Sequence, residues 1–73
     1  MSIFADRIKA CRKNINKTQR EVATDLGITE SGYQKYELSK REPKMETLNK
    51  FADYFDVSVD YLMGRSESSQ RLP

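Results

Sequence analysis

The chain has 73 residues, a length that suits one small domain, and about a third of its residues are charged. It contains no histidine and a single cysteine, which excludes a disulfide framework or a usual zinc cluster built within one chain, so we expect no metal and no cofactor. No apolar run approaches membrane-spanning length and a free thiol suits a reducing compartment, so the composition favours a soluble, cytoplasmic protein.

The net charge of +2 is small, but the charges are unevenly distributed along the chain. Residues 1–44 hold ten Lys and Arg against six Asp and Glu, a net charge of +4. Residues 45–73 hold three against five, a net charge of −2. A domain with a basic front and an acidic back would be oriented toward a polyanion such as DNA.

The first predicted helix covers Ile3 to Asn14, with Ser2 as its N-cap. Its core face is predicted from helical spacing to consist of Phe4, Ile8 and Cys11. The same spacing places on the outside Arg7, Lys9 and Lys13. We interpret Cys11 as a small buried apolar residue rather than a nucleophile. In the loop that follows, Ile15 is expected to tuck under the second helix.

Residues 18–37, TQREVATDLGITESGYQKYE, predict two short helices joined by a tight turn. Thr18 and Glu21 have the spacing of a capping box. Gly27 ends the first helix, because glycine adopts the left-handed conformation without a Cβ penalty, and Thr29 caps the second. This pattern is a helix-turn-helix, and the polar outer face of its second helix suits the major groove of DNA. An ordinary αα-hairpin is the alternative.

Two more helices are predicted after a basic loop at residues 38–44. The fourth helix covers Met45 to Phe55. Its apolar stripe consists of Leu48, Phe51, Ala52 and Phe55. The fifth helix is short and apolar and ends at Gly64. Residues 65–73 are polar and serine-rich and predict a disordered tail, which leaves residues 1–64 as the folded domain.

A set of residues spread over most of the chain has a familiar order. Its members are Thr18-Gln19, Gly27, Tyr36-Glu37, Arg41-Glu42-Pro43, Leu48 and residues 57–62 (VSVDYL). In these residues the chain resembles the Cro and phage-repressor (XRE-like) family of helix-turn-helix DNA-binding domains, from about Phe4 to Gly64. The resemblance implies an all-α, compact five-helix bundle of the lambda-repressor-like type. It further implies a transcriptional regulator of double-stranded DNA, a repressor that binds a pseudo-palindromic operator as a homodimer through helix 29–37.

The resemblance also implies site residues. The candidates for base contacts are Glu30, Ser31, Gln34 and Lys35. Lys35 can donate to guanine O6 and N7, Glu30 can accept from cytosine N4, and Ser31 can bond either kind of base edge. The candidates for phosphate contacts are Gln19, Thr29, Lys40, Arg41 and Lys44. For Arg41 a structural role is the alternative.

An arginine in the family pairs with the glutamate that closes the recognition helix, and these positions correspond to Arg12 and Glu37. A solvated arginine is the alternative for Arg12. The chain departs from the family pattern at Ser39, which stands where glycine is common and where a positive φ would strain serine mildly. A second departure is Gly32, whose place inside a helix costs about 1 kcal/mol relative to alanine.

The C-terminal helix commonly forms a two-fold dimer in this family, so Tyr61 and Met63 are candidates for a dimer interface. Their alternative role is to complete the core. The alternative function for the whole domain is an adaptor that binds a protein partner. No enzyme or small-molecule substrate is expected, because the chain offers no histidine, glycine-rich phosphate loop or paired-carboxylate motif.

Overall fold

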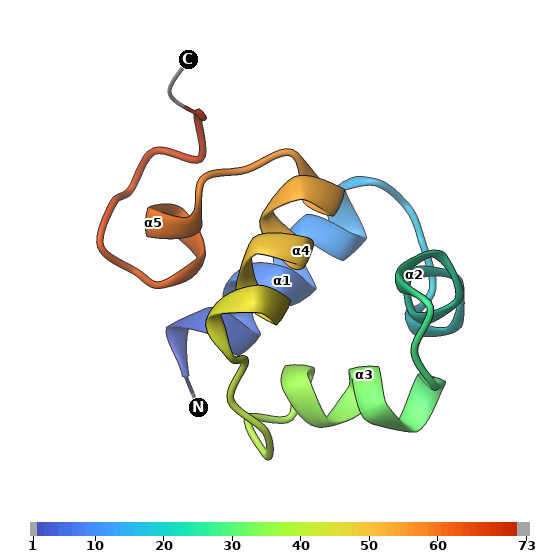
Figure 1. The fold of residues 1–73 in the computed structure, drawn as a ribbon. Helices are drawn as coiled ribbons and strands as arrows, with labels where there is room; N and C mark the ends of the chain where they lie inside the picture. The colour runs from blue at the N-terminus through green and yellow to red at the C-terminus, as the bar shows by residue number, and fades with distance from the viewer. Residues whose placement is uncertain (1, 72–73) are drawn as a thin grey trace.

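The computed structural model describes residues 2–71, and in these residues it contains five α-helices and no β-strand. The helices are α1 (Ile3–Asn14), α2 (Gln19–Leu26), α3 (Glu30–Glu37), α4 (Met45–Phe55) and α5 (Val59–Leu62). Helices α1 and α4 lie at the centre, with α2 and α3 on one side and α5 on the opposite side (Figure 1). The predicted all-α bundle is confirmed. Within residues 2–71 no helix is both long enough and apolar enough to cross a membrane.

The ends of the helices follow the predicted caps. Ser2 Oγ accepts a hydrogen bond from the backbone N–H of Ala5 at 3.1 Å. Thr18 and Glu21 form the capping box, since each side chain accepts a hydrogen bond from the backbone N–H of the other. Gly27 has φ 74° and ends α2 in the left-handed conformation. The tight turn of the helix-turn-helix is therefore present as predicted.

The core is organised around the ring of Phe51 in α4, which is almost fully buried. Its centroid lies 5.6 Å from that of Phe4 in α1 and 5.2 Å from that of Tyr36 in α3. Both pairs are edge-on, the arrangement that aromatic quadrupoles favour. Tyr33 and Phe55 complete the cluster at 6.0 and 6.5 Å. These rings join α1, α3 and α4, so they determine how α3 lies on the rest of the domain.

Three side chains of the first third of the chain lie differently from the prediction. Ile15 is 41% exposed and does not tuck under α2, because the turn after α1 carries it outward. Cys11 packs against the core but is only partly buried. Arg7 was placed outside by helical spacing, yet its side chain is 17% exposed. Spacing identifies the core stripe of α1, but it does not tell that another segment covers the flank beside it.

The segment that covers Arg7 is α5 with the chain that follows. The Arg7 guanidinium lies 4.1 Å from the ring centre of Tyr61. Its Nη1 donates to the carbonyl oxygens of Tyr61 at 2.9 Å and Ser66 at 2.7 Å. Arg7 thus links the first helix to a carbonyl 59 residues further along the chain.

The fifth helix ends at Leu62, two residues before the predicted Gly64, which has φ 79° in the turn that follows. Residues 65–71 contain no helix. In this segment Ser69 accepts a hydrogen bond from the backbone N–H of Ser58 at 3.0 Å, and Arg71 forms an ion pair with Asp53 at 2.6 Å. Disorder of residues 65–73 and the domain boundary at residue 64 stay predictions, and residues 1, 72 and 73 lie outside the described residues.

Candidate nucleic-acid interface

The helix α3 has one buried face and one exposed face. Tyr33 and Tyr36 point into the core, whereas Ser31 and Lys35 are exposed on the opposite side. Ser31 and Lys35 are one helical turn apart, so they lie next to each other on the surface. Within residues 2–71 the ammonium group of Lys35 has no ion-pair partner. These two predicted base-contacting residues are therefore available to a ligand.

The other two candidates, Glu30 and Gln34, contact α2 instead. Glu30 Oε1 accepts a hydrogen bond from Arg20 Nε at 3.2 Å. Gln34 Nε2 donates one to Gln19 Oε1, also at 3.2 Å. Because residues 30 and 34 are one turn apart, one edge of α3 lies along the first turn of α2. The four candidates thus divide into an exposed pair and a pair that contacts α2.

The end of α3 is held by a buried ion pair between Arg12 and Glu37. Arg12 Nε and Nη2 donate to the two carboxylate oxygens of Glu37 at 2.7 and 3.2 Å, and the two side chains are 13% and 3% exposed. The carboxylate also accepts hydrogen bonds from the Tyr33 hydroxyl and, at 3.0 Å, from Gln19 Nε2. A third nitrogen of Arg12, Nη1, donates to the carbonyl oxygen of Lys17 at 3.0 Å. Residues from α1, α2 and α3 therefore share one carboxylate.

Burial and hydrogen bonding act on the pKa of Glu37 in opposite directions. Burial raises the pKa, but the hydrogen bonds from Arg12, Tyr33 and Gln19 outweigh it and bring the pKa below the ordinary value of 4.5. Burial and the neighbouring carboxylate raise the pKa of the Tyr33 hydroxyl, which therefore stays protonated as a donor. The Glu37 carboxylate is therefore charged at neutral pH, and both of its oxygens accept hydrogen bonds.

The lowered pKa of Glu37 predicts a loss of stability in acid. A carboxylate whose pKa is lower in the folded state stabilises the fold above its unfolded pKa, and this contribution is lost as the pH falls through the folded value. We expect the free energy of unfolding to be nearly constant between about pH 6 and 8, where the chain has no histidine to titrate, and to fall below about 4.5. Denaturant unfolding measured across pH tests this, and Glu37→Gln should make the acid slope shallower. An equal slope in that variant would contradict the assignment.

Two predicted phosphate-contacting residues already have roles within the domain. The amide of Gln19 accepts from Gln34 and donates to Glu37, so it joins the first turn of α2 to α3. Thr29 Oγ1 caps α3 by accepting from the backbone N–H of Gly32 at 3.0 Å. A Cβ atom at residue 32 would lie 2.9 Å from that hydroxyl oxygen. Glycine inside the helix therefore leaves room for the cap.

The remaining phosphate candidates lie in the loop after α3. Lys40, Arg41 and Lys44 are exposed. The Arg41 guanidinium also lies 5.8 Å from the ring centre of Tyr36, on the side of α3 that faces the core. Arg41 thus combines an exposed charge with a contact to α3.

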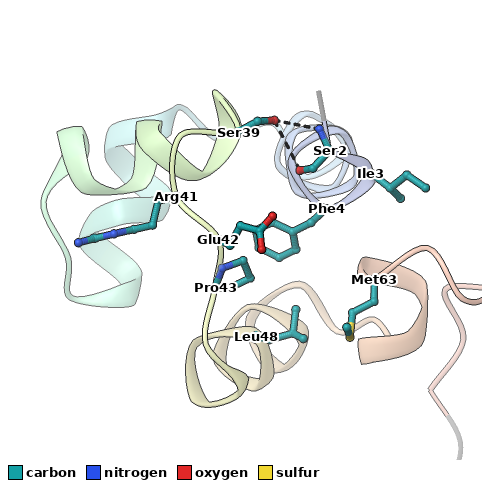
Figure 2. A pocket seen from close by; sticks show the side chains of 9 residues that line it. All are labelled: Ser2, Ile3, Phe4, Ser39, Arg41, Glu42, Pro43, Leu48 and Met63. Atoms are coloured by element: carbon teal, nitrogen blue, oxygen red, sulfur yellow. Dashed lines mark hydrogen bonds between the residues drawn. The ribbon is translucent and has the colours of Figure 1, made fainter.

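The loop is anchored to the N-terminus through Ser39. This residue has φ 60°, the left-handed conformation expected if the family geometry is kept. Its Oγ accepts a hydrogen bond from the backbone N–H of Ser2 at 3.0 Å, as Figure 2 shows. Below this contact a groove of about 350 Å³ runs between the start of α1, the loop and the end of α5, with the exposed side chains of Ile3 and Met63 on one rim.

Sequence reasoning did not single out Arg20 or Arg7. Arg20 is one of thirteen basic residues, and its partner Glu30 lies ten positions away on the next helix, so the periodicity of a single helix does not relate them. Arg7 was placed on the outside of the first helix, and no pattern in the sequence indicated that residues 61–66 would cover it. Both contacts depend on how separate helices meet.

The fold and the surface of α3 define a helix-turn-helix domain, in which the second helix is supported by the first and exposes a polar edge. A helix-turn-helix family model matches residues 8–62. The chain belongs to this family of Cro and phage-repressor type, as its sequence predicted. The matched domain is a helix-turn-helix and not an enzyme domain, as the sequence predicted.

Relatives in two bacteria are similar over nearly the whole chain. An uncharacterized HTH-type transcriptional regulator, YqaE of Bacillus subtilis, is 41% identical over 96% of this chain and 60% of its own length. The cryptic phage CTXphi transcriptional repressor RstR of Vibrio cholerae is 45% identical over 92% of this chain and 62% of its own. The chain therefore spans about 60% of the length of these curated relatives.

A solved structure has the same fold. The solution structure of the SOS-response transcriptional repressor LexA from Eubacterium rectale superposes with a TM-score of 0.80, covering 97% of this chain and 77% of that one. The two sequences are 22% identical, so this likeness concerns the fold alone.

Proposed function

We propose that the chain is a sequence-specific double-stranded DNA-binding transcriptional regulator that places α3 in the major groove. The observation that carries the proposal is the division of α3: one edge is bound to α2, while Ser31 and Lys35 remain exposed, and the one side-chain contact of Ser31 is a long one of 3.5 Å between its hydroxyl and that of Thr29. A helix that contacts bases needs a fixed position relative to the DNA backbone, because the phosphate contacts determine the register of the base contacts. The names of the relatives as transcriptional regulators support this function.

The loop after α3 supplies the contacts that do not depend on sequence. Lys40, Arg41 and Lys44 are exposed cations within seven residues of the end of α3, and each would add salt-sensitive affinity by binding a phosphate. The remaining amide N–H of Gln19 and the N-terminus of α2 favour a phosphate on the other side of α3. The recognition helix would then sit between two sets of backbone contacts.

The regulator is proposed to act as a homodimer on a pseudo-palindromic operator with half-sites roughly 34 Å apart. The exposed Met63 beside the partly buried Tyr61 gives the end of α5 an apolar surface that a second copy would cover. Repression would follow if the operator overlaps a promoter.

Selection of bound duplexes from a random pool at near-physiological salt tests the proposal. An enriched palindrome with two half-sites is the expected result. A single half-site would retain DNA binding and contradict the dimer. Salt-sensitive binding without enrichment would contradict sequence-specific regulation and favour the alternative, an adaptor for a protein partner.

Two lysines of the interface should behave differently when replaced. Lys35→Ala is expected to relax the preference at one operator position, at a cost of about 1–3 kcal/mol in discrimination, because this side chain faces the bases. Lys40→Ala should weaken binding to all duplexes alike and reduce the salt slope by about 1, because it faces a phosphate. Titrations of operator and single-base variants at several salt concentrations separate these effects. Identical behaviour of the two variants would contradict the assignment of the recognition face.

A further inference from the structure

The ion pair between Arg20 and Glu30 lies at the open edge of the helix-turn-helix. Arg20 belongs to the first turn of α2, and Glu30 is the first residue of α3. The Arg20 side chain is 81% exposed and that of Glu30 is 38% exposed. Exposed pairs of this kind contribute between about zero and 1 kcal/mol to stability. The pair therefore contributes little to the stability of the fold, and its exposed groups can bind a ligand.

The geometry of the contact leaves most of the guanidinium free. Only Nε of Arg20 donates to Glu30, at 3.2 Å. Within residues 2–71, Nη1 and Nη2 have no hydrogen-bond partner. A guanidinium bound to a carboxylate through Nε presents its two terminal nitrogens on another edge, and that fork matches two acceptor oxygens of one phosphate.

The negative charge of Glu30 bears on how α3 approaches DNA. A carboxylate at the N-terminal end of a groove-binding helix would approach the phosphates of DNA, which repel it. Arg20 offsets that charge while keeping its own donors directed outward. The first helix of a helix-turn-helix crosses the DNA backbone, so a cation in the first turn of α2 lies where a phosphate is expected.

We propose that Arg20 is a further DNA-contacting residue, which binds a backbone phosphate through Nη1 and Nη2, and that Glu30 is its positioning residue. This inference rests on the proposed DNA-binding function. It assigns Glu30 a role through Arg20 and leaves the reading of bases to the exposed pair Ser31 and Lys35.

A double-mutant cycle on the selected operator tests the inference. Arg20→Ala should weaken binding about tenfold, as expected for the loss of a charge-assisted hydrogen bond, equally for all duplexes, and should reduce the salt slope by about 1. In the Arg20→Ala background, Glu30→Gln should restore part of the lost affinity, because it removes the unpaired carboxylate. Glu30→Gln alone should change affinity less than Arg20→Ala.

The matched control is Arg71→Ala, which removes another ion-paired arginine, bound to Asp53 of α4. It should leave operator binding nearly unchanged, and thermal unfolding should show that all variants are folded. Unchanged binding by Arg20→Ala overturns the inference while the proposed function stands. A loss confined to one base position overturns the phosphate assignment. Absence of any duplex binding by the unmodified chain overturns both.

Discussion

Glu37→Ala is expected to destabilise the domain by about 3–5 kcal/mol, because it leaves the buried guanidinium of Arg12 without its partner. The carboxylate is 3% exposed and accepts four hydrogen bonds from three side chains. Its removal therefore also leaves the Tyr33 hydroxyl and the Gln19 amide without an acceptor. Small domains have a total stability of about 5–15 kcal/mol, so this loss would remove a large part of the free energy of unfolding. Urea unfolding followed by circular dichroism measures the loss.

The surface pair provides the comparison for this variant. Glu30→Ala removes a carboxylate from an exposed arginine, so its effect on stability should stay within about 1 kcal/mol. Both variants remove a glutamate that is paired with an arginine, but the Glu37 pair is buried and its carboxylate accepts four hydrogen bonds, whereas the Glu30 pair is exposed and has one. If Glu37→Ala and Glu30→Ala had equal effects, the Arg12 pair would be solvated and not buried in solution.

Phe51→Ala should be the second severe change, with an expected loss of about 3–5 kcal/mol. The ring is almost fully buried and lies within 6.5 Å, centroid to centroid, of four other aromatic rings from α1, α3 and α4. Truncation removes the apolar contact area and leaves a cavity that the three helices cannot all close. The same unfolding measurement detects the loss.

Two controls separate the cavity from a general effect of substitution. Phe51→Leu keeps most of the volume, so it should destabilise the domain by only about 1.5 kcal/mol, markedly less than Phe51→Ala. Leu38→Ala, at a residue that is 60% exposed, should change stability by no more than about 0.5 kcal/mol. A small effect of Phe51→Ala, comparable to that of Leu38→Ala, would show that the aromatic cluster does not hold α3 in place.

The roles of several candidate site residues depend on the contact between α2 and α3. These roles could be assigned only from the structure. Ser31, Gln34 and Lys35 were all candidates for base contacts because they occupy the base-contacting places of the family that the chain resembles. The structure separates Gln34 from the other two, because Gln34 donates to Gln19 across the interface with α2. A helical pattern gives the direction of a side chain around its own axis, but it contains nothing about the neighbouring helix.

The sequence by itself determined the five helices and most of their ends, because a cap involves atoms only three residues apart; the exception is α5, which ends at Leu62 and not at the predicted Gly64. Thr18 with Glu21, Thr29 with Gly32, and the left-handed Gly27 are such local features. Tertiary structure alone decided that Ile15 is exposed, that Arg7 is covered by α5, and that Glu30 pairs with Arg20. The contacts of Arg7 and Glu30 join residues from 10 to 59 positions apart. Their energies, like the exposure of Ile15, depend on which segments pack against each other, and only the folded chain defines that.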